Sequence, residues 1–350
     1  MTVHSKFNLS RAFKLTPHAV PGAKFDAKFK NFSIIQTNYK TVGRHGIRAD
    51  IVVPNSIPAG KRPVIVRFHG GGLIIGESLF PDWFPHWLLQ LAEKYSAIIV
   101  SANYRLLPES TGLDTLDDVE DLWSWLHSHH LAKILASQHH PHPLELDLSR
   151  ILTAGDSAGG LLSLSLALSH PDEVRATIVA YPLIDVDDPA FAAGSSTQLF
   201  QLSPDSDSVL DQHLRSIKPG DVVSSARPPN RLDLFAEVIQ YGKFPEFYQR
   251  GSENSPHRGR LFLLERLENP ETKLPRGGIV IMHGTEDDLV PHAGSEKFIK
   301  KARELLKDKQ GCDKLVLTLQ PGGHGFDCNV RLSDHWLNEA IKGAVETWLE

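Results

Sequence analysis

A serine near the middle of the chain stands in a setting that could make it a nucleophile. Ser157 is the centre of the segment Gly155-Asp156-Ser157-Ala158-Gly159. An apolar run precedes this segment and a helix-forming run follows it, so we expect a strand, a sharp turn and a helix. Gly155 and Gly159 lack a Cβ atom and leave room for the strained backbone of such a turn. The Ser157 hydroxyl is therefore predicted to rise above the edge of a sheet, while the adjacent Asp156 side chain points away from it.

A second glycine-rich segment offers backbone hydrogen-bond donors. His69-Gly70-Gly71-Gly72 comes directly after the apolar run Val64–Phe68. Consecutive glycines allow N–H groups to approach a ligand closely, and such donors lower a reaction barrier by roughly 2.7–4 kcal/mol each when they bind a developing oxyanion. The N–H of the residue after the serine, at the start of a helix, is aimed at the same point. A flexible turn between a strand and a helix is the alternative interpretation of the glycines.

A serine hydroxyl is a weak nucleophile at neutral pH and needs a general base that is oriented by a carboxylate. With a serine on this kind of turn, the carboxylate and the histidine follow it in that order, each after a late strand. His324 stands between two glycines after the run Leu315–Gln320, and we predict that it is the base. The alternative is a surface loop histidine, since the chain has 18 histidines. Glu286, Asp287 and Asp288 offer the acid; we favour Asp287 over Asp288, partly because of the family resemblance that the motifs carry.

Alternating strand-like and helix-like segments carry these residues. The strand-like runs are Phe32–Tyr39, Ala49–Val53, Val64–Phe68, Ala97–Ser101, Ile151–Ala154, Ala176–Tyr181, Gly278–His283 and Leu315–Gln320. The helix-like runs are Trp83–Tyr95, Thr115–Leu135, Ala158–Ser169, Gly294–Lys307 and His335–Leu349. The inner strand-like runs are almost wholly apolar, as strands covered on both faces are. This alternation predicts an α/β fold with a mostly parallel, twisted sheet of eight strands and helices on both faces.

One connection is far longer than the roughly 2–6 residues that are usual between a helix and a strand in such folds. About 95 residues separate Tyr181 from Gly278, and they include the helical run Leu234–Tyr241. We predict a catalytic domain over residues 31–350, interrupted by a cap insertion at about 187–275, with residues 1–30 contributing to the cap. A surface excursion is the alternative. Aromatic residues that could line an apolar pocket, or simply pack in a core, are Trp83, Phe84, Trp87, Phe235, Tyr241, Phe244, Phe247 and Tyr248.

The motifs together resemble those of the hormone-sensitive-lipase-like branch of the α/β-hydrolases, also called family IV esterases or fold-3 hydrolases. The matching segments are His69-Gly70-Gly71-Gly72, Tyr104-Arg105-Leu106-Leu107-Pro108-Glu109, Gly155-Asp156-Ser157-Ala158-Gly159-Gly160, the run His-Gly-Thr-Glu-Asp-Asp-Leu-Val-Pro at 283–291, and Gly323-His324-Gly325-Phe326. They span residues 69–326 of the chain. The resemblance implies an α/β-hydrolase fold with a helical cap and a serine–histidine–aspartate triad.

The resemblance also implies roles for single residues. The family's triad acid aligns with Asp287, and its oxyanion donors align with Gly71, Gly72 and Ala158, while Gly70 shapes the turn. The segment Tyr104–Glu109 is expected to organise the loop under the site.

Three residues depart from the family's usual pattern. Asn103 and Leu107 replace an aspartate and an alanine, and Leu73 stands where an aromatic residue often follows the glycines. These positions concern a structural turn and the acyl pocket, so the departures bear on the shape of the substrate rather than on the triad.

Composition excludes several other classes of protein. The 350 residues carry 37 Lys+Arg and 42 Asp+Glu, a net charge of −5, so we expect no nucleic-acid partner. Two cysteines make no disulfide framework, and we find no signal-like segment and no apolar run long enough to span a membrane, so we predict a cytoplasmic protein. Histidines at 127, 129, 130, 139, 140 and 142 have no cysteine or spaced carboxylate to complete a metal site. We expect neither a metal nor an organic cofactor, and either a monomer or a homodimer.

These observations predict a serine hydrolase that cleaves carboxylic esters or thioesters of a small, largely apolar molecule through an acyl-enzyme. The same triad could instead transfer the acyl group, release a thioester or close a lactone. A non-catalytic small-molecule receptor on the same fold is a minor alternative, because such receptors lose the histidine that is present here as His324. A peptidase is a further alternative, and the three glycines at 70–72 argue against it.

Overall fold

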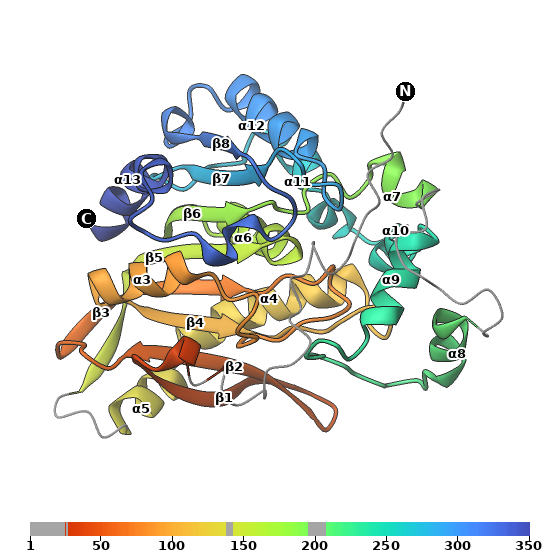
Figure 1. The fold of residues 1–350 in the computed structure, drawn as a ribbon, viewed down its shortest axis with the longest axis horizontal. Coiled ribbons are helices and arrows are strands. Elements are labelled where there is room, and N and C mark those ends of the chain that lie inside the picture. The colour runs from red at the N-terminus through yellow and green to blue at the C-terminus, as the bar shows by residue number, and fades with distance from the viewer. Residues whose placement is uncertain (1–24, 26, 138–142, 195–207) are drawn as a thin grey trace.

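A single eight-stranded sheet forms the centre of the protein in the computed structural model, which describes residues 25, 27–137, 143–194 and 208–350 (Figure 1). The strands are β1 (Phe32–Val42), β2 (His45–Pro54), β3 (Gly60–Phe68), β4 (Ile98–Ala102), β5 (Leu144–Asp156), β6 (Val174–Ala180), β7 (Ile279–Gly284) and β8 (Val316–Gln320). Their order across the sheet is β1-β2-β4-β3-β5-β6-β7-β8. β1 and β2 are antiparallel to their neighbours, and β4, β3, β5, β6, β7 and β8 run parallel to one another. The predicted mostly parallel α/β sheet is confirmed.

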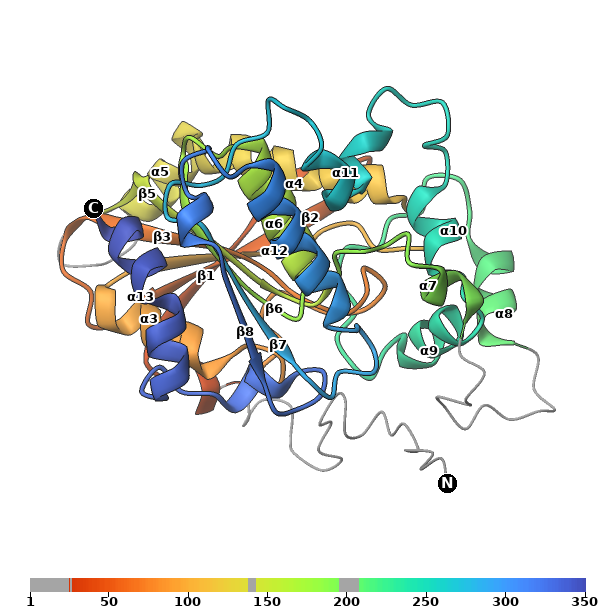
Figure 2. The ribbon, with the colours of Figure 1, turned by 90° about the horizontal axis from the view of Figure 1, so that it is seen from above.

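Helices cover both faces of this sheet (Figure 2). The helices are α3 (His86–Tyr95), α4 (Gly112–Leu126), α5 (His129–Ser137), α6 (Ala158–Ser169), α7 (Pro189–Ala193), α8 (Val209–Ser216), α9 (Leu232–Gln240), α10 (Phe244–Gln249), α11 (Leu263–Arg266), α12 (Ala293–Leu305) and α13 (His335–Leu349). Short 3₁₀ turns are η1 (Arg258–Leu261), η2 (Cys312–Lys314) and η3 (Phe326–Asn329). In the part of the chain described here, no helix is both long and apolar enough to cross a membrane.

Side chains alternate between two apolar cores because successive residues of a strand point to opposite faces. Val64 and Val66 of β3 pack with α4, α6 and α12 in one core, and Ile65 packs with α3 and α13 in the other. Burial on both faces explains why the inner part of β3, Val64–Phe68, is a mostly apolar run in the sequence. The arrangement holds the carboxyl ends of six parallel strands along one edge of the sheet.

The helix predicted over Thr115–Leu135 is wrong in one respect, because the structure contains two helices there. α4 ends at Leu126 and α5 begins at His129. The ring Nδ1 of His127 lies 2.9 Å from the Trp123 carbonyl oxygen. This carbonyl is the acceptor that the backbone N–H of His127 would need to continue the helix. This side-chain contact thus occupies the Trp123 carbonyl where α4 ends, at a point where the apolar pattern of the sequence continues.

The long connection between β6 and β7 carries the helices α7 to α11. Of these, α7 to α10 gather beyond the carboxyl ends of the strands, whereas α11 packs against α6 and α12 (Figure 1). Two backbone hydrogen bonds between Gly76 and Ala226 join it to the loop after β3. Of the N-terminal segment, residues 1–24 and 26 lie outside the described part. Phe29, which is described, packs edge-on against Phe84 in the core on the α3 side of the sheet.

Candidate active site

Ser157 sits at the tight turn between β5 and α6. Its backbone has φ 55° and ψ −122°, a strained conformation for a residue with a Cβ atom. The Ser157 N–H donates to the Ala180 carbonyl at 2.9 Å, which holds the turn against β6. A Cβ atom on Gly155 would overlap the carbonyl of Gly159, and one on Gly159 would overlap that of Phe68. The two glycines are therefore a steric requirement of the turn.

A continuous chain of hydrogen bonds joins Ser157 to a histidine and a carboxylate. The His324 Nε2 lies 3.0 Å from the Ser157 Oγ, and the His324 Nδ1 lies 2.8 Å from the Asp287 Oδ2. All three residues are buried. The loops after β5, β7 and β8 deliver them to one point, since the carboxyl ends of these parallel strands share an edge of the sheet. This geometry allows the imidazole to take the hydroxyl proton while the carboxylate fixes its tautomer.

Burial and hydrogen bonding separate Asp287 from its two acidic neighbours, because Glu286 and Asp288 are exposed. The Asp287 Oδ1 accepts the N–H groups of Leu289 at 3.1 Å and Val290 at 2.9 Å. Burial favours the neutral acid, but the charge of His324 and the hydrogen bonds from histidine side chains and the backbone outweigh it. The pKa of Asp287 therefore lies well below its usual value. Asp287 remains a carboxylate at neutral pH.

The loop after β3 presents backbone N–H groups beside the serine. Within the described residues, the N–H groups of Gly71, Gly72 and Ala158 have no hydrogen-bond acceptor. Gly71 and Gly72 line the same pocket as Ser157. The Gly70 N–H instead donates to the Asp156 Oδ2 at 2.9 Å, which agrees with the predicted role of Gly70 in shaping the turn.

Asp156 supports this loop and does not join the triad arrangement. Its Oδ1 pairs with the Arg67 Nη2 at 2.8 Å, and both side chains are almost completely buried. Burial raises the pKa of Asp156 to about 6, although the Arg67 charge opposes the change. Asp156 thus links the serine turn to the glycine loop through Arg67 and Gly70.

The segment Tyr104–Glu109 makes the contacts of a structural support. The Tyr104 hydroxyl donates to the His69 carbonyl at 2.6 Å, and the two rings stack with their centroids 4.4 Å apart. The Leu107 N–H donates to the Leu73 carbonyl at 2.7 Å. These contacts fix both ends of the glycine loop, at His69 and at Leu73.

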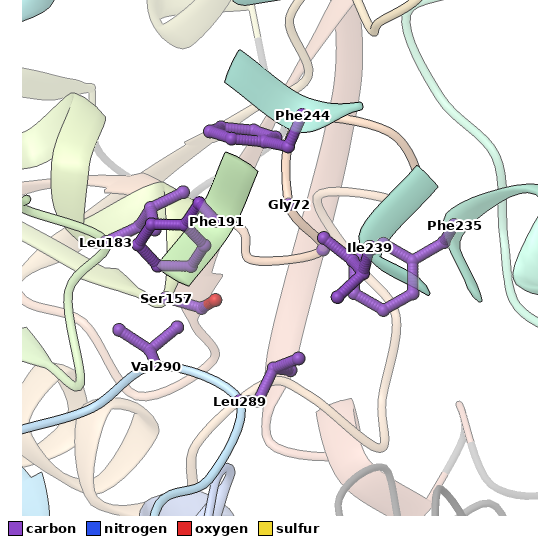
Figure 3. Close-up of a pocket in the computed structure, with 10 residues that line it drawn as sticks. Gly72, Ser157, Leu183, Phe191, Phe235, Ile239, Phe244, Leu289 and Val290 are labelled. Atoms are coloured by element: carbon purple, nitrogen blue, oxygen red, sulfur yellow. The ribbon is translucent and has the colours of Figure 1, made fainter. Parts of the chain in front are cut away.

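An apolar pocket opens directly onto Ser157 (Figure 3). Its other walls are Gly71, Gly72, Leu183, Phe191, Phe235, Ile239, Phe244, Leu289 and Val290. The space between these side chains is narrow and partly open to solvent. Among the described residues that line this pocket none carries a charge, so the pocket suits an uncharged apolar group.

Only two of the aromatic residues singled out in the sequence reach this pocket, namely Phe235 and Phe244. Trp83, Phe84, Trp87, Phe247 and Tyr248 are buried in the cores, and Tyr241 is half exposed. The walls Phe191, Leu183 and Leu289 were not anticipated, because nothing in their local sequence distinguishes them from core residues.

Sequence reasoning also missed a polar cluster behind His324. The ring of Tyr181 lies 4.5 Å from the ring of His324, centroid to centroid. The Tyr181 hydroxyl donates to the Asp327 Oδ1 at 2.6 Å, and the Trp87 Nε1 donates to the Asp327 Oδ2 at 2.9 Å. Burial raises the pKa of Asp327. No motif marks these residues, which are far apart in the chain.

The described residues contain no group of three or more histidine, cysteine or acidic side chains that could hold a metal ion. Of the histidines predicted to be solvated, His127, His129 and His130 are exposed, and the His127 ring also packs against Trp123. His139, His140 and His142 lie outside the described residues.

Comparison with known proteins supports a single family. Residues 65–226 match a family model described as an alpha/beta hydrolase fold. A protein of Phoma named a probable carboxylesterase, M8, is 26% identical over 336 residues, which cover 92% of this chain and 98% of that protein. A second probable carboxylesterase, clz11 of Cochliobolus lunatus, is 30% identical over 204 residues, 55% of this chain and 86% of that protein.

Two further similarities are more limited. The tuliposide A-converting enzyme 2 of Tulipa gesneriana is 30% identical over 201 residues, 54% of this chain and 52% of that enzyme. Among solved structures, esterase B of Lactobacillus rhamnosis in a tributyrin phosphonate complex matches with a TM-score of 0.57 at 13% identity, over 93% of this chain and 90% of that one. At 13% identity the structural match shows a shared fold and nothing about function.

Proposed function

The chain belongs to the α/β-hydrolase family and is a carboxylesterase-like hydrolase, and from that premise we propose that it cleaves carboxylic esters through an acyl-enzyme on Ser157. The observation that carries the proposal is the unbroken chain of hydrogen bonds from Asp287 through His324 to Ser157. This chain ends at the mouth of an apolar pocket, where an ester carbonyl would meet the serine oxygen.

The proposed reaction has two halves. In the first, the His324 Nε2 takes the proton of Ser157 while the serine oxygen attacks the ester carbonyl, and the imidazolium then protonates the departing alcohol. In the second, water attacks the acyl carbon while the His324 Nε2 takes its proton, and the imidazolium then returns that proton to the Ser157 oxygen as the acid leaves. Asp287 stabilises the imidazolium throughout. The N–H groups of Gly71, Gly72 and Ala158 bind the negative oxygen of each tetrahedral intermediate.

We further propose that the insertion at 187–275 acts as a cap, since it supplies the pocket walls Phe191, Phe235, Ile239 and Phe244. The substrate is then a small, largely apolar ester, or a thioester of similar shape. The proposal places the enzyme in the cytoplasm, because Cys312 and Cys328 are unpaired. It includes either a monomer or a homodimer.

Transfer of the acyl group to an alcohol or thiol, or to a hydroxyl of the same molecule, would use the same acyl-enzyme. The intact His324–Ser157 contact favours either reaction over a non-catalytic receptor. Rates on p-nitrophenyl esters from acetate to octanoate, with Ser157→Ala as control, test the proposal. Product analysis with added alcohol separates hydrolysis from transfer. Equal rates of ester cleavage by the wild type and by Ser157→Ala would contradict the proposal that Ser157 forms the acyl-enzyme.

A further inference from the structure

Three side chains of the insertion converge on the turn 107–110 that follows β4. The Arg231 Nη2 donates to the Leu107 carbonyl and to the Glu109 Oε2, both at 2.8 Å. The His213 Nε2 lies 2.8 Å from the Glu109 Oε1. The Arg250 Nη2 donates to the carbonyls of the same turn, at 2.7 Å to that of Pro108. The turn 107–110 is therefore one of the polar points at which the insertion is attached to the sheet domain.

The contact is buried, which makes the pairing of charges important. The side chain of Glu109 is 4% exposed and that of Arg231 is 12% exposed. Two nitrogens of Arg231, Nε and Nη1, are buried and have no hydrogen-bond partner in the described part of the chain. A buried guanidinium in this setting depends on its carboxylate, because removing one partner of a buried pair leaves an uncompensated charge.

Arg231 also begins the helix that forms one wall of the pocket. It is the N-cap of α9, with a left-handed backbone at φ 66°. Phe235 lies one turn further on, and its N–H donates to the Arg231 carbonyl at 2.9 Å. The position of Arg231 therefore sets the position of the Phe235 ring.

The Phe235 ring lies against the glycine loop of the site. A Cβ atom placed on Gly72 would be only 2.6 Å from the Phe235 Cε2. The turn 107–110 contacts that loop as well, through the hydrogen bond from the Leu107 N–H to the Leu73 carbonyl. One turn thus holds both the oxyanion loop and the helix that packs on it.

We propose that the Glu109–Arg231 ion pair is a latch that seats α9 and so sets the length of acyl chain accepted between Phe235 and Ser157. The inference rests on the proposed function. Glu109 and Arg231 act as positioning residues, since they touch neither the serine nor the pocket. Loss of the pair lets Phe235 move away from Gly72 and lengthens the space beside the serine.

The test compares Glu109→Gln and Arg231→Lys with a matched control, Asp117→Asn. Asp117 also pairs with the insertion, through Arg260 at 2.7 Å, but this pair is exposed. Arg231→Lys keeps the positive charge but has a shorter side chain and lacks the Nη2 group that donates to both acceptors, so it provides a second variant if Glu109→Gln does not fold. The measured quantity is kcat/KM on p-nitrophenyl octanoate divided by kcat/KM on the acetate, in preparations titrated with a fluorophosphonate.

We expect this ratio to rise about tenfold in the latch variants. This is the lower end of the rate difference that an apolar pocket makes between substrates differing by one methylene. Asp117→Asn should keep the wild-type ratio. A ratio in the latch variants that equals or falls below the wild-type value overturns the latch, as does an equal rise in Asp117→Asn. Failure of the wild type to bind the fluorophosphonate refutes the proposed function instead, so the two failures are distinguishable.

Discussion

Replacement of Asp287 by asparagine tests how the carboxylate controls the histidine. In the native site the Asp287 Oδ1 accepts the N–H groups of Leu289 and Val290, and the Oδ2 accepts from the His324 Nδ1. An asparagine has one carbonyl oxygen for these two sides. With that oxygen toward the backbone, the NH₂ group of the asparagine faces His324. The Nδ1 of the imidazole must then be unprotonated, so that it can accept a hydrogen bond from this NH₂ group. The ring proton is then on Nε2, and a protonated Nε2 cannot accept the proton of Ser157.

The opposite orientation of the amide keeps the correct tautomer and leaves two buried N–H groups without acceptors. Each costs about 1–3 kcal/mol, so the unproductive orientation is favoured by about 2–6 kcal/mol. At 1.36 kcal/mol per factor of ten, we expect kcat/KM to fall by about 30-fold to 10⁴-fold. In serine proteases of the chymotrypsin type the same change lowers kcat by about 10⁴, at the upper end of this range.

The assay is hydrolysis of p-nitrophenyl acetate, with thermal unfolding as a check that the variant is folded. Glu286→Gln and Asp288→Asn are matched controls, since both side chains are exposed on the same loop. Each control should stay within about twofold of the wild type, as surface substitutions usually do. A loss of less than tenfold in Asp287→Asn, or an equal loss in Asp288→Asn, would refute the reasoning.

Two further changes test the support of the site. Tyr181→Phe removes the hydrogen bond to Asp327 and keeps the ring beside His324, so we expect a loss of about 1–3 kcal/mol in the free energy of unfolding, measured in urea. An unchanged unfolding midpoint would show that the Tyr181 hydroxyl contributes nothing. Asp156 has a pKa raised to about 6 in the folded protein, so the folded state binds this proton more tightly than the unfolded state. Its contribution to stability therefore increases as the pH falls through 6, and the stability of the wild type relative to Asp156→Asn should be higher at pH 5 than at pH 8. The same stability difference at both pH values would contradict this assignment.

The parts of the fold that sequence reasoning captured are those with local causes. Strand β7 and the inner part of β3, Val64–Phe68, are mostly apolar because both of their faces are covered, and α6 follows directly from the turn at Ser157. The break between α4 and α5 was missed because the apolar pattern continues across it. The contact from His127 to the Trp123 carbonyl that accompanies the break leaves no periodic signal in the sequence.

The triad arrangement was predictable because its residues stand in motifs with steric requirements, as the glycines around Ser157 show. The pocket walls were not, because the place of Phe191 and Ile239 depends on how the insertion packs onto the sheet domain. Tyr181 and Asp327 were missed for a related reason: they meet across 146 positions of the chain, and neither stands out in its own segment.

The central claim is that Ser157 is the nucleophile of an esterase, and covalent labelling tests it most directly. A fluorophosphonate probe should modify the wild type once per chain, at the peptide that contains Ser157, as read by intact mass and peptide mapping. Ser157→Ala should not be modified. Absence of labelling in the folded wild type, or labelling that persists in Ser157→Ala, would contradict the claim.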